Sequence, residues 1–381
     1  MAKIQDVLAR NEELAEHVIG PASDEIDRLR QFPRKNIEAL GQAGVLGLMV
    51  PEQYEGLNGG LTELVHSLEV LARRCPSTAM VVLMHHCATA VITARGSESL
   101  KRNVLPAIVQ GKHLSTLAFS EAGSGGHFYM PVSQVSQIRS SCRVSAFKSF
   151  VTSAGEADTY VVSTRRANAA NPTELDLYLV DKNTKGLTTQ GRFEGLGLRG
   201  NASAPMKLES VAVSEDIRLG SEGTGFQAML EVVLPHFQIG LASICVGLAN
   251  AVFQVATTHV SKRKYEHADA SLAAIPRVQF LVAEMALELN GVRAYLTETI
   301  RKALVGSPDA MIDILGVKVK AAEGLLAVTS RAMMLGGGSA FGKQGGLERI
   351  FRDSQAAAVM APSSDVLKEF VGKACLGLPL F

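Results

Sequence analysis

The chain has 381 residues, of which 47% are hydrophobic and 20% are charged, which is enough to bury a large core in roughly two or three domains. Its 38 basic and 37 acidic residues nearly cancel, and this balance argues against a nucleic-acid partner or an anionic membrane surface. Five scattered cysteines without a CxxC pair argue against a disulfide framework or a zinc site. We therefore expect reduced thiols in a cytoplasmic protein without a metal.

The first 112 residues follow a helical pattern. Ile37, Leu40, Val45 and Leu48 recur at helical spacing, and a Gly-rich turn follows Pro51. Two further helices are expected at 61–75 and 77–95, and the second is apolar almost all round, which indicates burial. We predict an all-α domain over residues 1–112.

Residues 113–223 change character. Short segments that alternate apolar and polar residues are separated by Gly, Asn and Pro, as in HLSTLAF, DTYVVSTRR and LDLYLVDKN. This pattern predicts β-strands, which we expect to be antiparallel in a barrel or sandwich.

From residue 224 to residue 381 the helical period returns in long segments, so we predict a C-terminal four-helix bundle and an α+β fold overall. The apolar stretch from Ile239 to Ala256 is nearly long enough to span a bilayer. It contains Ser243, Asn250 and Gln254 and is rich in Gly and Ala, which suits close packing of helices in a soluble bundle. We expect no membrane span.

Four short motifs stand in a particular order along the chain. LAFSEAGSGG runs from Leu117, SFVTSAG from Ser149, SKRKY from Ser261 and LGGGSAFGKQGGLERIFRD from Leu335. Each alone has an ordinary explanation, namely a tight turn, a core strand, or a basic helix end that favours the dipole. Together, in this order, they resemble the motifs of the acyl-CoA dehydrogenase superfamily, whose members are flavoproteins with the same helix–strand–helix arrangement.

The resemblance implies FAD as the cofactor. The glycines of the first motif allow backbone amides to approach a ring or a phosphate, and Glu121 would help to form the wall around the flavin. Phe150 would be its aromatic neighbour, and Thr152 would contact its reactive edge. The implied cofactor-binding residues are Leu117, Phe119, Ser120, Gly125, Gly126, Phe150, Thr152, Arg263, Gly336, Gly337 and Ser363.

Arg263 would reach the FAD pyrophosphate of a neighbouring subunit, because an arginine fork suits a phosphate. The resemblance therefore implies a homo-dimer or homo-tetramer. It also implies an acyl-CoA or related small-molecule substrate, and an electron-transfer flavoprotein or a flavin reductase as the redox partner.

The substrate side departs from the family pattern. Dehydrogenation of an acyl thioester needs a base for the α-proton, and the family places a Glu eight residues after the Asp of the closing Arg-Asp. In this chain that position is Ala361, and the alternative position on the first long C-terminal helix reads Phe237 and Gln238. Asp365 and His236 are the remaining candidates for the base. Asp365 can equally be a solvated or cofactor-facing acid, and His236 can equally be a packed histidine.

Three functions stay open at this point. The first is an acyl-thioester dehydrogenase with a relocated or absent base. The second is a flavin-dependent monooxygenase on the same fold, although no histidine occurs in QAAAVMAP, where such relatives use one. The third is a catalytically degenerate flavin-binding paralogue. Shared fold alone does not establish the reaction.

Overall fold

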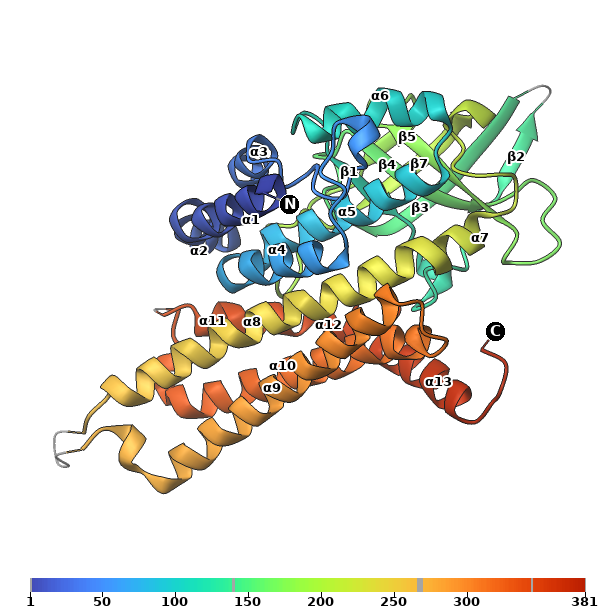
Figure 1. Ribbon diagram of the computed structural model, residues 1–381. Helices are drawn as coiled ribbons and strands as arrows, with labels where there is room; N and C mark the ends of the chain where they lie inside the picture. Colours follow the sequence, from blue (N-terminus) through green and yellow to red (C-terminus); the bar gives the residue numbers. More distant parts are fainter. Residues whose placement is uncertain (1, 139–140, 266–269, 344, 381) are drawn as a thin grey trace.

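The computed structural model describes residues 2–138, 141–265, 270–343 and 345–380 (Figure 1). It begins with helices, continues with strands from Ser115, and returns to helices at Gly225. The N-terminal helices are α1 (Ala2–Leu14), η1 (Ala15–Ile19), α2 (Gly20–Leu29), α3 (Arg34–Gln42), η2 (Glu52–Tyr54), α4 (Leu61–Arg74), α5 (Pro76–Arg95) and α6 (Glu98–Val109). This order confirms the α+β prediction.

The middle region forms two small sheets. Its elements are β1 (Ser115–Ala118), η3 (Ala122–Ser124), β2 (Val135–Ile138), β3 (Ser141–Val151), β4 (Thr159–Arg165), β5 (Leu175–Asp181), β6 (Leu187–Thr189), β7 (Ala204–Val213) and η4 (Glu215–Ile217). One sheet has the order β1-β4-β5 and the other β2-β3-β7-β6. The pattern of buried residues agrees with two packed sheets, since all of β1 and nearly all of β4 and β5 are buried.

One detail of the predicted sheet is wrong. We expected antiparallel strands, but β1 pairs in parallel with β4, with Ser115 opposite Thr159 and Ala118 opposite Val162. Parallel neighbours need a long connection, and the stretch between these two strands contains the whole β2–β3 hairpin. The other pairings in the two sheets are antiparallel.

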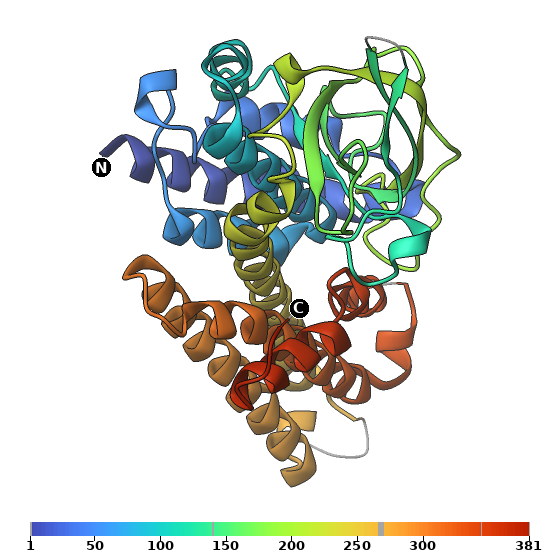
Figure 2. The ribbon, with the colours of Figure 1, turned by 90° about the vertical axis from the view of Figure 1, so that its right-hand side faces the viewer.

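The C-terminal region is built on three long helices, and the shorter α11 and α13 pack on the third of them. Its elements are α7 (Gly225–Ala228), η5 (Met229–Val233), α8 (Leu234–Lys262), η6 (Leu272–Ala274), α9 (Pro276–Leu304), α10 (Ala310–Phe341), α11 (Leu347–Ser354), α12 (Ala356–Val359) and α13 (Ser364–Cys375). Figure 2 shows α9, α10 and α13 below, with the N-terminal helices and the two sheets above them.

Helix α8 lies between the two helical regions. It packs on α4 and α5 on one side and on α9 and α10 on the other. The close approach of α8 to α5 and α4 depends on glycine. A Cβ at Gly240 would come within 2.3 Å of the Leu83 side chain, and one at Gly247 within 2.4 Å of the Glu69 carbonyl oxygen.

Two stretches of the chain, Pro76–Arg95 and Gly225–Lys262, are long and apolar enough to cross a membrane, but 78% and 72% of their apolar windows are buried inside the protein. Packing in the core accounts for that apolar character.

Candidate active site

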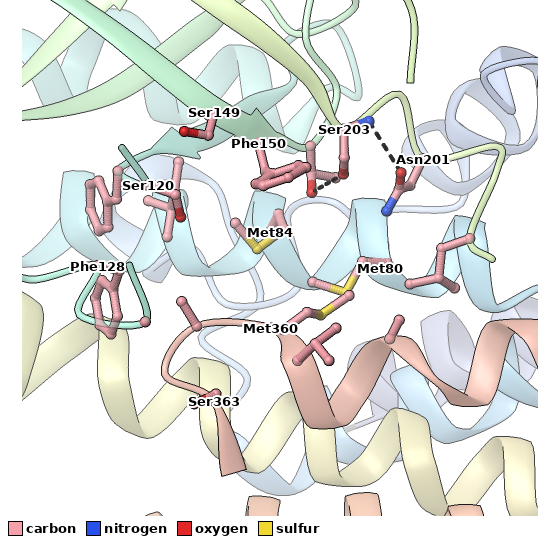
Figure 3. A pocket seen from close by; sticks show the side chains of 18 of the residues that line it. Met80, Met84, Ser120, Phe128, Ser149, Phe150, Asn201, Ser203, Met360 and Ser363 are labelled. Carbon is pink, nitrogen blue, oxygen red and sulfur yellow. Dashed lines mark hydrogen bonds between the residues drawn. The ribbon is translucent and has the colours of Figure 1, made fainter. Parts of the chain in front are cut away.

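A cavity of about 780 Å³ lies beside the two-sheet middle region, which we call the β-domain (Figure 3). Helix α5, the start of α8 and the segment after α11 close its other sides. Its β-domain wall includes Leu117, Phe119, Ser120, Ser149, Phe150, Thr152, Asn201 and Ser203. Its helical wall includes Met80, Met84, Val233, Phe237, Ala356, Val359, Met360 and Ala361. The volume is that of a site for a small molecule or a cofactor ring.

The β-domain wall carries a hydrogen-bonded polar group. The hydroxyls of Thr152 and Ser203 lie 3.0 Å apart, and the Ser203 N–H donates to Oδ1 of Asn201 at 3.2 Å. The Thr152 carbonyl accepts from the Thr116 hydroxyl at 2.9 Å, so the chain directly after β3 is held to β1. The amide nitrogen of Asn201 points into the cavity (Figure 3). These contacts fix polar side chains in place before any ligand arrives.

Next to this group, β3 presents an exposed ring and an unused hydroxyl. Phe150 lines the cavity and is 67% exposed, which is unusual for a phenylalanine beside a core. The Ser149 hydroxyl is buried beside it and has no hydrogen-bond partner within the described parts of the chain. The exposed ring is typical of a surface that a bound ring covers.

The Gly-rich loop after β1 leaves room for such a ring. Gly125 has a φ of +53°, and a Cβ built on it would meet nothing within 4 Å. Gly125 and Gly126 both line the cavity. A bare backbone at this rim lets a ligand come close to the main chain.

A buried ion pair anchors the same loop. Glu121 and Lys148 are 3% and 0% exposed, and the Lys148 ammonium lies 2.7 Å from Oε1 of the carboxylate. The carboxylate also accepts from the N–H of Val132 and from the N–H and hydroxyl of Ser133. Burial opposes ionisation of Glu121, but Lys148 and these donors outweigh it and hold the pKa of the carboxyl below its ordinary value. Glu121 is therefore a fixed anion and has no role as a proton acceptor.

The helical wall offers no proton acceptor in its place. Among the described residues that line the cavity, only Glu121 and Arg352 are ionisable. Arg352 is engaged by the carboxylate of Asp27 at 2.6 Å and by Glu348 at 2.7 Å. Ala361, which the resemblance predicts to stand at the position of the family base, lines the cavity with a methyl group.

The two other candidate bases lie away from the cavity. Asp365 is exposed in the first turn of α13, and it is not among the lining residues. His236 is half-buried on α8, and its Nδ1 lies 2.7 Å from the Val232 carbonyl oxygen. Phe237 lines the cavity. Successive residues of a helix are turned by about 100°, so the preceding His236 faces in another direction. Neither side chain is positioned to take a proton from a ligand in the cavity.

Nine of the residues singled out from the sequence meet in this one cavity, and their contacts with FAD remain a prediction. They are Leu117, Phe119, Ser120, Gly125, Gly126, Phe150, Thr152, Ala361 and Ser363, and Glu121 and Phe237, which the sequence also brought out, line the same cavity.

Three others lie elsewhere in the chain. Arg263 is exposed at the end of α8, 26 residues beyond Phe237, or about 39 Å along the helix axis. Gly336 and Gly337 lie near the end of α10, and Gly337 has a φ of +52° with open space around it. None of the three lines the cavity of its own chain.

Sequence reasoning missed Asn201, Ser203, Lys148 and Lys318. Ser203 and Asn201 lie in the loop before β7, and only the fold brings them to Thr152. Lys148 and Lys318 are fully buried, and each interrupts an otherwise apolar face, which was the available signal.

The residues present fit a flavin. The exposed Phe150 ring, the Asn201 amide and the bare backbone at Gly125 offer a planar group both apolar contact and hydrogen bonds.

Comparison with known proteins places the chain in a family. Family models described as the N-terminal, middle and C-terminal domains of acyl-CoA dehydrogenase match residues 3–112, 116–211 and 223–376. The short-chain specific acyl-CoA dehydrogenase of Clostridium acetobutylicum is 25% identical over 93% of both chains.

Two solved structures share the fold. Butyryl-CoA dehydrogenase from Megasphaera elsdenii is 21% identical, with a TM-score of 0.92 over 99% of this chain and 98% of the other. An FAD complex of PigA is 19% identical, with a TM-score of 0.91 over the same shares. Because the three domain models together cover nearly the whole chain in the family's order, the protein belongs to the acyl-CoA dehydrogenase family of FAD-dependent oxidoreductases.

Proposed function

We propose that the cavity binds the flavin ring of FAD against its β-domain wall and an acyl thioester against its helical wall, for α,β-dehydrogenation without a side-chain base. The observation that carries this proposal is Ala361, which lies in the cavity at the position where the family places its base. The apolar helical wall suits a hydrocarbon chain, which binds by the area it removes from water. The relatives described above include dehydrogenases of short acyl-CoA esters.

The β-domain wall would hold the cofactor. Thr152, Ser203 and Asn201 form a fixed polar edge, and Phe150 packs against the ring. When bound, FAD supplies the acceptor for the hydrogen that leaves the β-carbon with its electron pair.

The helical wall would hold and orient the thioester, but it provides no side chain for the α-proton. Ala361 cannot accept a proton, and Glu121 is a fixed anion in its ion pair. The proton must therefore pass to water, so we expect ester binding with slow reduction of the flavin. A positioned general base accounts for about 10²–10⁴-fold in rate.

The Ala361 backbone can still contribute. Its N–H donates to no acceptor within the described parts of the chain, and the residue lines the cavity. A free amide at this place can receive the thioester carbonyl oxygen and stabilise the charge that gathers there.

The test is anaerobic mixing of the FAD-loaded protein with a series of acyl-CoA esters while the flavin absorbance is followed. We expect a prompt change of the absorbance on binding and a slow bleaching that depends on the acyl group. Absence of binding for every ester, measured by calorimetry on fully loaded protein, would remove the proposal.

We also propose that the protein assembles as a homo-dimer or homo-tetramer. Arg263 lies about 39 Å along α8 from its own cavity, so any flavin that it contacts belongs to another subunit. Large apolar side chains are exposed on α9 and α10, where Phe280 is 65%, Leu287 73% and Phe341 83% exposed.

Light scattering tests the assembly, and Phe280→Glu should shift it towards the monomer while the exposed Phe147→Glu of β3 should not. A monomeric wild-type protein that retains its FAD would contradict the proposed assembly. We further propose an electron-transfer flavoprotein or a flavin reductase as the redox partner, and a cytoplasmic location, for which the reduced thiols and the buried apolar helices are the support.

A further inference from the structure

Lys318 lies directly behind the substrate-facing segment of the cavity. It belongs to α10 and is fully buried, with an exposed fraction of 0%. Its ammonium donates to the carbonyl oxygen of Pro362 at 2.9 Å and to that of Met360 at 3.2 Å. Among the described residues, no carboxylate forms an ion pair with it, although a buried ammonium is normally paired. The two carbonyls that it binds stand on either side of Ala361.

The bond to Met360 determines where the next amide points. The Met360 carbonyl and the Ala361 N–H belong to one peptide unit, and this unit is trans. In a trans peptide the C=O and N–H bonds point in opposite directions. Lys318 is not among the residues that line the cavity, whereas Met360 and Ala361 are. An ammonium that holds the carbonyl from behind therefore turns the N–H of Ala361 towards the cavity.

The charge on Lys318 also strengthens that amide as a donor. A hydrogen bond to a charged donor is about twice as strong as a neutral one, and it polarises the peptide that accepts it. The free N–H at the other end of the same peptide gains positive character in consequence. The effect is largest where water is excluded, as it is around a fully buried side chain.

We propose that Lys318 is a positioning residue that aims and polarises the Ala361 amide at the carbonyl oxygen of the bound acyl thioester. This inference rests on the proposed function, since it requires an ester in the cavity. The proposed role of the buried Lys318 ammonium does not require a base at position 361. Lys318 itself touches neither the ester nor the cofactor.

The protonation state of Lys318 allows the proposed polarisation of the Ala361 amide to be varied with pH. Burial lowers the pKa of Lys318 to about 8, and the residue donates both hydrogen bonds most strongly while it is charged. Of the groups on the elements packed against it, the Cys245 thiol of α8 is the one that acts on its charge. Burial raises the pKa of Cys245 to about 12, so the thiol stays neutral across the range in which Lys318 titrates.

Infrared difference spectroscopy measures the polarisation directly. The FAD-loaded protein is mixed with butyryl-CoA labelled at its carbonyl carbon, and the stretching frequency of the bound carbonyl is compared with that of the free ester. The missing base helps here, because the ester persists in the complex. The variants are Lys318→Met, which removes both hydrogen bonds, and Lys318→Gln, which keeps an uncharged donor. Lys320→Met is the matched control, since Lys320 is exposed on the same helix and pairs with Glu288.

In the wild type and in Lys320→Met we expect the carbonyl frequency to fall on binding. In Lys318→Met that shift should be at least halved and the affinity for the ester should fall about tenfold, with FAD content unchanged. Lys318→Gln should lie between them. In the wild type the shift should shrink as pH rises through about 8.

Two results would distinguish failure of the Lys318 proposal from failure of the proposed function. A full shift in Lys318→Met overturns the role of Lys318 and leaves the proposed function standing. Wild-type protein that carries FAD and binds no ester overturns both. Lys318→Gln, which keeps a donor at the buried position, decides the matter if Lys318→Met does not fold, since a full shift in this variant shows that the charge on Lys318 does not polarise the amide.

Discussion

On the β-domain wall of the cavity, polar side chains are fixed by bonds to their neighbours, as Thr152 is to Ser203 and Glu121 is to Lys148. The helical wall instead presents methionines, two valines, a phenylalanine, Ala356 and Ala361, none of which carries a charge. The two walls therefore differ in what holds them. One is held by hydrogen bonds and an ion pair, and the other is an apolar surface that includes flexible methionines.

The two walls also differ in how far they follow the family pattern that the sequence resembles. The motifs that form the β-domain wall are retained in this sequence, whereas the base position on the helical wall is not. Under the proposed function, binding of the cofactor and removal of the α-proton depend on different surfaces. A change in one of them leaves the other in place.

The largest effect is expected from breaking the framework of the β-domain wall. Lys148→Met leaves the buried Glu121 carboxylate without its counter-charge and should lower the free energy of unfolding by about 3–5 kcal/mol. Denaturant unfolding measures this loss. The double variant with Glu121→Gln should recover part of it, and the exposed Lys207→Met should change little. A single variant as stable as the wild type would show that the ion pair does not hold this wall.

A carboxylate on the helical wall should restore the missing step. Ala361→Glu should raise the rate of flavin reduction by an acyl-CoA ester by about 10²-fold or more, because a base then faces the α-proton. Rapid mixing under anaerobic conditions measures the rate. Ala361→Gln has the same size without the basic group and should stay slow. Equal rates in the two variants would show that position 361 does not face the reacting carbon.

A smaller effect is expected from one hydroxyl of the β-domain wall. Thr152→Val removes the contact with Ser203 and any bond to the cofactor, and it should weaken FAD binding by about fivefold to tenfold. Titration of flavin fluorescence measures the affinity. Ser203→Ala removes only the contact between the two hydroxyls and should cost less. If both variants lose the same affinity, Thr152 acts on Ser203 alone.

The smallest effect concerns Asp353, which connects the loop of Leu198 to α11. Its Oδ1 accepts from the Leu198 N–H at 2.6 Å, and burial raises the pKa of the carboxyl to about 6. A folded-state pKa above the ordinary value means that the folded form binds the proton more tightly. This group therefore stabilises the fold at acidic pH, and its contribution declines as pH rises from about 4 to about 6.

Asp353→Asn keeps an acceptor for Leu198 and removes the titration, so its stability relative to the wild type should increase over that range. Denaturant midpoints at several pH values give the difference. A difference that does not vary with pH would mean that Asp353 ionises normally.

Much of the fold was accessible from sequence because it depends on local periodicity. The helical period of α4 and α5 and the alternation in β4 and β5 predicted these elements in their places. The parallel pairing of β1 with β4 was not accessible, because it joins residues more than forty positions apart and no local pattern encodes it.

The cavity shows the same division. Gly125, Phe150 and Thr152 stood out because they belong to short motifs, and Ala361 because it stands at a fixed distance from Asp353. Asn201 and Lys318 did not, since their positions depend on loops and helices that meet only in the folded chain. His236 failed as a candidate because a shift of one residue on a helix turns a side chain to another face.

The exposure of Phe150 has a consequence for newly synthesised chains. A chain that has folded before it receives its cofactor displays a bare aromatic ring at the mouth of a hollow lined by methionines. Such an exposed apolar surface promotes aggregation with other chains that lack the cofactor. Bound cofactor covers this surface and also stabilises the folded state by mass action. The supply of riboflavin during expression should therefore decide how much of the product is recovered in solution and how much in aggregates.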